Sequence, residues 1–107
     1  MALADVGNGT NTCDGTEQTL DTETGAKTYV LMLDLNAMAN GNTLTVRLKT
    51  RPLTGGTTRT VYRADYANVQ TTQPIVVSAP VPSLWQLIAT LEGSNTLSVP
   101  WVLMTID

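Results

Sequence analysis

Residues 43–50 read TLTVRLKT, a stretch in which apolar and polar side chains alternate strictly. The apolar positions are Leu44, Val46 and Leu48, and Thr, Arg and Lys side chains occupy the positions between them. Because successive side chains of a β-strand point to opposite faces, this pattern predicts a strand with one buried and one solvated face. A strand of this kind has to lie in a sheet that covers a core, so the pattern favours packed sheets.

Other segments of the chain carry strand-like patterns with turn residues between them, for example Asn40-Gly41-Asn42. They are residues 16–21, 27–35, 58–66, Ile75–Ser78, 84–92 and 97–106. Segment 84–92 fits a helical stripe as well as a strand, and the neighbouring sheet segments favour the strand. Nineteen threonines, which suit a half-exposed pleated surface, also favour sheet over helix. We therefore predict an all-β fold, a single antiparallel β-sandwich or jelly-roll-like domain of about seven strands.

Prolines and glycines refine this prediction at particular places. The prolines at 74, 80 and 82 confine the strand around Ile75–Ser78 to an edge or a strand end, and Pro100 indicates a bulge or an edge. Segment 27–35 is apolar on both sides, which is typical of a strand covered on both faces. Residues 1–13 are rich in Gly, Asn and Thr, so we expect a flexible N-terminal arm ahead of a sandwich domain over residues 14–107.

Positive charge is concentrated in the middle of an acidic chain. The formal net charge is −3, yet five of the six Lys and Arg residues lie between positions 47 and 63. Six of the nine acidic residues lie in the first third of the chain, beside one basic residue, Lys27. Such a polarity suits head-to-tail contact between copies of the chain, or docking on an acidic shell. The sequence pI of about 4.6 argues against a general nucleic-acid binder.

The predicted pairing of 43–50 with 58–66 gives this charge a location. The buried face joins the three aliphatic residues of 43–50 to Tyr62, Ala64 and Tyr66. The outer face then carries the four candidate partner-binding residues, which are Arg47, Lys49, Arg59 and Arg63. Like charges on adjacent strands repel each other, and Asp65 is the one acid of this hairpin, so we interpret the face as a contact surface for a partner. The alternative is that long basic side chains merely shield an outer sheet face and discourage edge aggregation.

The sequence offers little material for catalysis or for a cofactor. It contains no His, the commonest general base and metal ligand, and one Cys, so an internal disulfide is excluded. The one acidic cluster consists of Asp14, Glu17, Asp21 and Glu23, which we interpret as a solvated edge rather than a glycosidase pair or a calcium site. We therefore expect no enzymatic activity, no metal and no cofactor.

Two further expectations concern the membrane and the tryptophans. No run approaches the roughly 18 apolar residues of a membrane span, and the first residues resemble no secretion signal, so synthesis in a cytoplasm is expected. Trp85 and Trp101 stand among aliphatic residues, which favours core or interface packing for both. A small carbohydrate-binding module, which presents such rings on a sheet, is the alternative.

The stretch DGTEQTLDTETGAKTYVLMLDLNAMANGNTLTVRLKT resembles a group of small virion proteins of tailed bacteriophages. In these, a DGTEQTL-like opening leads into an aliphatic strand, an M-x-x-G turn and a strand ending in R-x-K-T. The pieces PVPSLWQLIATLEG and VPW resemble the second half of the same group, so the similarity spans residues 14–107. It implies a structural component of the virion, first of all a head decoration (cement) protein, or else a neck, tail or fibre protein. The implied partners are the major capsid protein, other virion proteins and further copies of the chain, with no nucleic acid and no membrane.

Overall fold

Alternating and apolar segments of the sequence become nine β-strands in the computed structural model, which describes residues 3–106. The strands are β1 (Leu3–Thr12), β2 (Glu17–Thr24), β3 (Lys27–Asp34), β4 (Thr43–Thr50), β5 (Arg59–Ala67), β6 (Ile75–Val77), β7 (Val81–Ser83), β8 (Gln86–Gly93) and β9 (Ser98–Ile106). No helix occurs in this described part of the chain. The all-β prediction is confirmed, and the ambiguous segment 84–92 is a strand.

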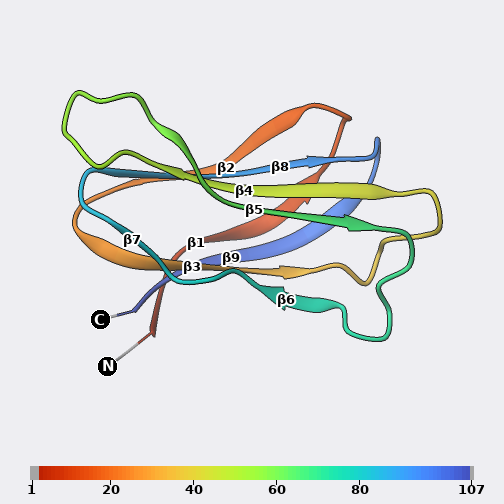
Figure 1. The fold of residues 1–107 in the computed structure, drawn as a ribbon. Coiled ribbons are helices and arrows are strands. Elements are labelled where there is room, and N and C mark those ends of the chain that lie inside the picture. The colour runs from red at the N-terminus through yellow and green to blue at the C-terminus, as the bar shows by residue number, and fades with distance from the viewer. Residues whose placement is uncertain (1–2, 107) are drawn as a thin grey trace.

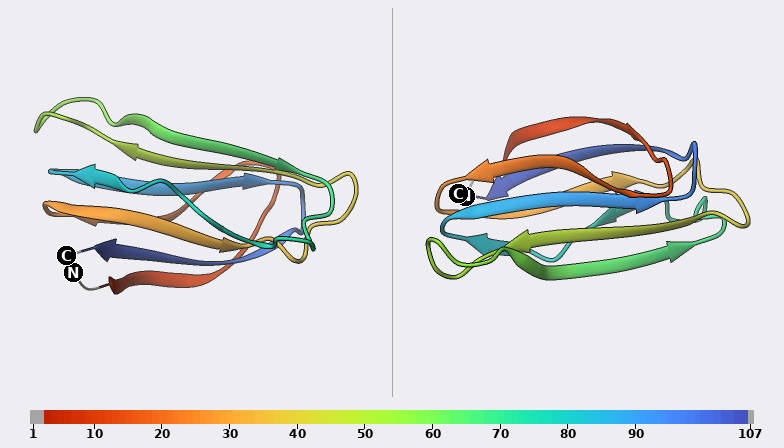
Figure 2. Two further views of the ribbon diagram at one scale, coloured as in Figure 1. Left: turned by 60° about the horizontal axis from the view of Figure 1, so that its bottom comes forward. Right: turned by 90° about the horizontal axis from the view of Figure 1, so that it is seen from above.

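The strands form two antiparallel sheets that pack face to face (Figure 1). One sheet has the order β1-β9-β3-β6, with β7 also paired to β3, and the other has the order β2-β8-β4-β5. The pairing is nested, because β1 pairs with β9, β2 with β8, β3 with β6 and β7, and β4 with β5. A long hairpin rolled into two sheets in this way is a jelly roll (Figure 2).

The core lies between the two inner faces and is aliphatic. Leu44, Val46 and Leu48 of β4 are 3% exposed or less, as the alternation in this strand predicts. They meet side chains of the opposite sheet such as Leu31 and Leu103, which are paired across β3 and β9 and are both buried. Tyr62, Ala64 and Tyr66 of β5 are partly buried against this cluster, which confirms the predicted inner face of the hairpin.

Proline positions agree with the expected edges. β6 and β7 are two short pieces of one edge strand, each paired with β3 alone, and Pro82 lies in the second piece. Between the pieces Ser78 keeps contact with β3, since its Oγ accepts from Leu31 N at 2.9 Å and its own N donates to Leu31 O at 2.8 Å. Pro100 of β9 pairs with β1 only, because the β3–β9 ladder ends at Trp101, so no second ladder requires its missing N–H.

The N-terminal segment differs from the expectation of a flexible arm over residues 1–13. Leu3–Thr12 forms β1, which pairs along its length with β9 at one edge of the first sheet. Residues 1–2 lie outside the described residues. The described part of the segment is thus one wall of the sandwich, and with the split of β6 and β7 it raises the strand number from about seven to nine.

Candidate interaction surface

The outer face of the sheet β2-β8-β4-β5 carries the charge that the sequence analysis singled out. We call it the charged face, and its ionic residues are Glu17, Arg47, Lys49, Arg63, Asp65 and Glu92. Arg47 Nη1 lies 2.9 Å from Glu92 Oε1 and 3.7 Å from Glu17 Oε1, and Lys49 Nζ lies 2.6 Å from Glu17 Oε2. Two cations of β4 are therefore neutralised by two carboxylates from β2 and β8.

Burial and pKa shifts are consistent with this network. Thr90 of β8 lies beneath it, 3% exposed, and donates to Glu17 Oε2 at 2.7 Å. Hydrogen bonds from Lys49 and then Thr90, opposed by partial desolvation, hold the pKa of the Glu17 carboxyl below its usual value. The hydrogen bond to Glu92 raises the pKa of the Arg47 guanidinium. Both charged forms are favoured, so the network is a stable ionic assembly at neutral pH.

The hairpin itself contains one acid, Asp65, as the sequence analysis states, but other strands of the sheet supply further carboxylates. Glu92 comes from β8, which pairs with β4, and Glu17 comes from β2, which lies beyond β8. Arg63 of β5 is also paired, since its Nε lies 3.3 Å from Asp65 Oδ2, and Thr45 donates to Asp65 Oδ1 at 2.6 Å. Hydrogen bonds from Thr45 and Arg63 lower the pKa of Asp65. Three of the four candidate residues thus have partners within the chain.

Arg59, the fourth candidate, does not share this face. The β4–β5 ladder shifts between Leu48 and Lys49, and beyond this bulge Arg59 pairs with Thr50. Directly paired residues lie on the same side of a sheet, and Thr50 faces inward, where its Oγ1 lies 3.0 Å from Ser83 Oγ of the other sheet. Simple alternation placed Arg59 with the other three cations, and the bulge moves it to the end of the sandwich.

The predicted acidic cluster is dispersed. Asp14 is exposed and accepts from the hydroxyl and the backbone N of Thr16, and Glu17 belongs to the charged face. Asp21 follows a bulge in β2 and faces the same way as Glu23, toward the edge of the sandwich near β1. No group of three or more potential metal ligands exists among residues 3–106.

The carboxyl groups of Asp21 and Glu23 lie close to each other on the same face of β2. Burial, followed by the hydrogen bond and the charge of Asp21, raises the pKa of Glu23. Asp21 Oδ2 is buried with no hydrogen-bond partner in the described chain, and it lies so close to Gly7 of β1 that a Cβ there would collide with it. The nearby carboxyl group of Asp21 therefore disfavours the charged form of Glu23.

Cys13 and the two tryptophans are structural. Cys13 is 2% exposed, and burial raises the pKa of its thiol, which makes the thiol unreactive. Trp101 packs against the core, as expected, beside Gly9. Trp85 is 41% exposed, and its indole Nε1 donates to Pro52 O at 3.1 Å. Trp101 thus belongs to the rim of the core, whereas Trp85 is not packed in the core and its packing in an interface stays a prediction.

The outer face of the other sheet is apolar, and the sequence analysis missed it as a surface. Val30 of β3 pairs with Met104 of β9, and Met32 pairs with Val102 of β9 and Val77 of β6. Because side chains alternate along a strand and the intervening pair Leu31–Leu103 points inward, these residues face outward. We call the solvent-accessible part of this surface the apolar face, made of Met32, Ile75, Val77, Val102 and Met104. Val30 points the same way but is buried. Ile75 and Val77 are 47% and 50% exposed. The two-sided apolar pattern of 27–35 was its signal.

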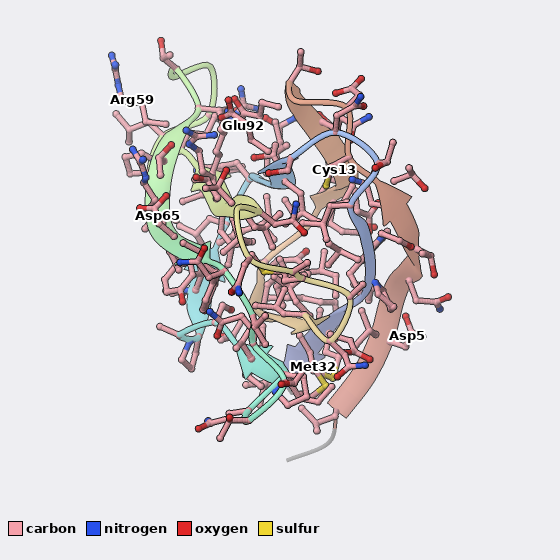
Figure 3. All side chains as sticks on the ribbon, turned by 90° about the vertical axis from the view of Figure 1, so that its right-hand side faces the viewer. Asp5, Cys13, Met32, Arg59, Asp65 and Glu92 are labelled. Carbon is pink, nitrogen blue, oxygen red and sulfur yellow. The ribbon has the colours of Figure 1, made fainter. Side chains whose placement is uncertain are left out.

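The two outer faces lie on opposite sides of the molecule, as Glu92 and Met32 show in Figure 3. Asp5 and Asn8 of β1, which bond to each other at 2.7 Å, lie at one border of the apolar face, and Asp34, paired with Ile75, lies at another. Within residues 3–106 no helix is long and apolar enough to cross a membrane.

Comparisons with protein-family models, with curated proteins and with solved structures found no match to this chain. Nothing in them bears on the resemblance to phage virion proteins.

Proposed function

We propose that this chain is a structural protein whose copies assemble through the apolar face, and that it serves as a decoration protein on the head of a tailed bacteriophage. The observation that carries the proposal is the half-exposed pair Ile75 and Val77, continuous with Met32 and Val102 on the neighbouring strands. When another protein covers contiguous aliphatic side chains on a sheet surface, these side chains lose contact with water. Each Å² of apolar area buried in this way contributes about 25 cal/mol to the free energy of association.

A second copy of the chain fits this face. The face offers aliphatic and thioether groups, with acidic residues such as Asp5 and Asp34 at its borders. Such a surface needs no oppositely charged partner, and two copies related by a twofold axis can cover it with the same patch. Assembly on a shell of high symmetry repeats this contact many times.

The resemblance over residues 14–107 supports a place in the virion. Jelly rolls are common in viral capsid domains, so the fold supports a role in the virion by analogy alone. On the head, the chain binds the shell of major capsid protein and stabilises it. A position in the neck, the tail or a fibre is the alternative reading of the same resemblance.

The assembly step is tested with charge on the apolar face. The double variant Ile75→Lys/Val77→Lys should be monomeric in sedimentation velocity at concentrations where the wild-type chain associates. Val69→Lys is the matched control, since Val69 is 47% exposed but lies in the loop after β5. Equal association of all three proteins, each with a native-like melting curve, would refute assembly through the apolar face.

The location is tested by electron microscopy of the phage particle that carries this protein. Density for the jelly roll on the outer head surface supports decoration. Density confined to the neck, tail or fibres, or none at all, would contradict it.

A further inference from the structure

A cleft of about 870 Å³ opens at the end of the sandwich where the β2–β3 turn, the β4–β5 loop and β7 meet. Its walls are apolar and include Pro52, Val61, Pro82, Leu84 and Ile106. We call it the end cleft. Its volume lies within the roughly 300–1,000 Å³ that is usual for ligand sites.

The end cleft is lined by the basic residues that the charged face does not use. Arg47, Lys49 and Arg63 are engaged in ion pairs, whereas Lys27, Arg51 and Arg59 line the cleft. Lys27 has an interaction of its own, so the inference rests on Arg51 and Arg59. No Asp or Glu side chain is among the described residues that line the cleft.

The Arg51 guanidinium is incompletely bonded. Its Nη1 donates to Gly56 O over a long 3.4 Å, and its buried Nε has no acceptor among the described residues. A guanidinium binds a carboxylate best through two nitrogens at once, so a carboxylate beside Arg51 would satisfy groups that the chain leaves unsatisfied. The Trp85 hydrogen bond to Pro52 O joins the β4–β5 loop to the β7–β8 connection next to Arg51.

Two of the strands that line the end cleft, β5 and β7, are sheet edges. β5 pairs only with β4, and β7 pairs only with β3. Each edge therefore presents backbone N–H and C=O groups on its outer side, which an added extended chain can pair with. Aliphatic walls then accept the apolar side chains of such a strand, and the two arginines accept its carboxylates.

We propose that the end cleft binds an extended polypeptide segment of a partner protein in which acidic and aliphatic residues alternate. This contact involves no residue of the apolar face and goes beyond the assembly proposed above. An acidic peptide fits better than a nucleic acid, because the cleft combines two arginines with aliphatic walls and offers no aromatic stacking platform among its described lining residues.

The test uses a fluorescein-labelled, terminally blocked hexapeptide that alternates Asp or Glu with Val, and its isosteric Asn/Gln analogue. The acidic peptide should bind in fluorescence polarisation, and Arg51→Gln/Arg59→Gln should weaken its binding about tenfold or more, since two charge-assisted contacts are lost. Arg63→Gln is the matched control, because it removes a cation of the same hairpin outside the cleft and should change binding less than about twofold.

Three outcomes would overturn the proposal: no binding of the acidic peptide, equal binding of the amide analogue, or equal binding by the double Arg variant. Tighter binding of a six-nucleotide oligothymidine would also overturn it, in favour of nucleic acid. The Ile75→Lys/Val77→Lys protein, if monomeric, should bind the peptide as the wild type does, so failure of the cleft and failure of assembly are distinguishable. Melting curves of all variants verify that they are folded.

Discussion

The two outer faces of this sandwich differ in the kind of side chain that they expose to water. The charged face contains its own counter-ions, since Glu17 of β2 and Glu92 of β8 pair with the cations of β4 from the β8 side of that strand. The apolar face leaves Ile75 and Val77 half exposed beside Met32, with Asp34 next to Ile75 at its border. The cations Arg47, Lys49 and Arg63 of the first face are paired within one chain, whereas the second face leaves aliphatic side chains in contact with water. This difference is why we propose the apolar face, and not the charged face, as the interface.

The largest effect on self-association is expected from adding one positive charge to the apolar face, compared with one added on the opposite side of the molecule. Met32→Lys puts an ammonium group at the centre of the apolar face and should weaken self-association about a hundredfold or more, because an unpaired buried charge costs several kcal/mol. Thr22→Lys, at an exposed position on the opposite side of the molecule, should leave association unchanged. Sedimentation equilibrium of both variants measures this difference, and equal weakening would abolish the distinction between the faces.

A smaller effect, on the free energy of unfolding, is expected from a substitution in the charged face. Glu17→Gln removes the carboxylate shared by Lys49 and Thr90, and should lower the free energy of unfolding at pH 7 by about 1 kcal/mol, a value reduced by partial exposure. The folded-state pKa of Glu17 is depressed, so its stabilisation is present above the unfolded pKa and is lost as the pH falls through the folded pKa. Urea unfolding of wild type and variant should therefore converge in acid, and a gap that persists there would contradict the ionic origin.

Glu23→Gln should act in the opposite direction, although both glutamates lie on β2. The folded-state pKa of Glu23 is raised, so the native state holds a proton more tightly, and stability is lost as the pH rises through the window between the two pKa values. The variant should be more stable than the wild type at neutral pH, by less than the Glu17 effect, and indistinguishable below the unfolded pKa. Urea titrations at several pH values decide the sign, and destabilisation at neutral pH would contradict a raised pKa of Glu23.

The smallest effect is expected at Arg63. Its partner Asp65 is exposed, and water and salt screen such a pair, so Arg63→Gln should leave the melting temperature unchanged within error. A clear drop in the melting temperature, measured by circular dichroism, would mean that the charged face is more cooperative than its geometry indicates.

Local pattern was enough to predict most of the fold. Residues 43–50 are a strand at the predicted boundaries, because apolar and polar side chains alternate there and so fit one buried and one exposed face. β1 was not predicted, since its Gly and Asn residues have little strand preference of their own and the partner strand β9 supplies the pairing. Sheet context overrode local composition at this one edge.

The site was harder to predict than the fold. Glu17 lies 32 positions before Lys49, so their contact depends on β2 and β4 both flanking β8. The bulge that redirects Arg59 leaves no clear mark in TRTVYRADY. Sequence reasoning finds which residues share a strand face, but the neighbours across two strands follow from the topology.

The most direct test of the difference between the two faces is thiol labelling of Val77→Cys and Thr45→Cys as a function of protein concentration. Cys13 is buried and contributes no fast reaction. We predict that the maleimide reaction at position 77 slows as the concentration rises, while the reaction at position 45 keeps the same rate. Equal and concentration-independent rates at the two positions, or protection at position 45 alone, would contradict the account.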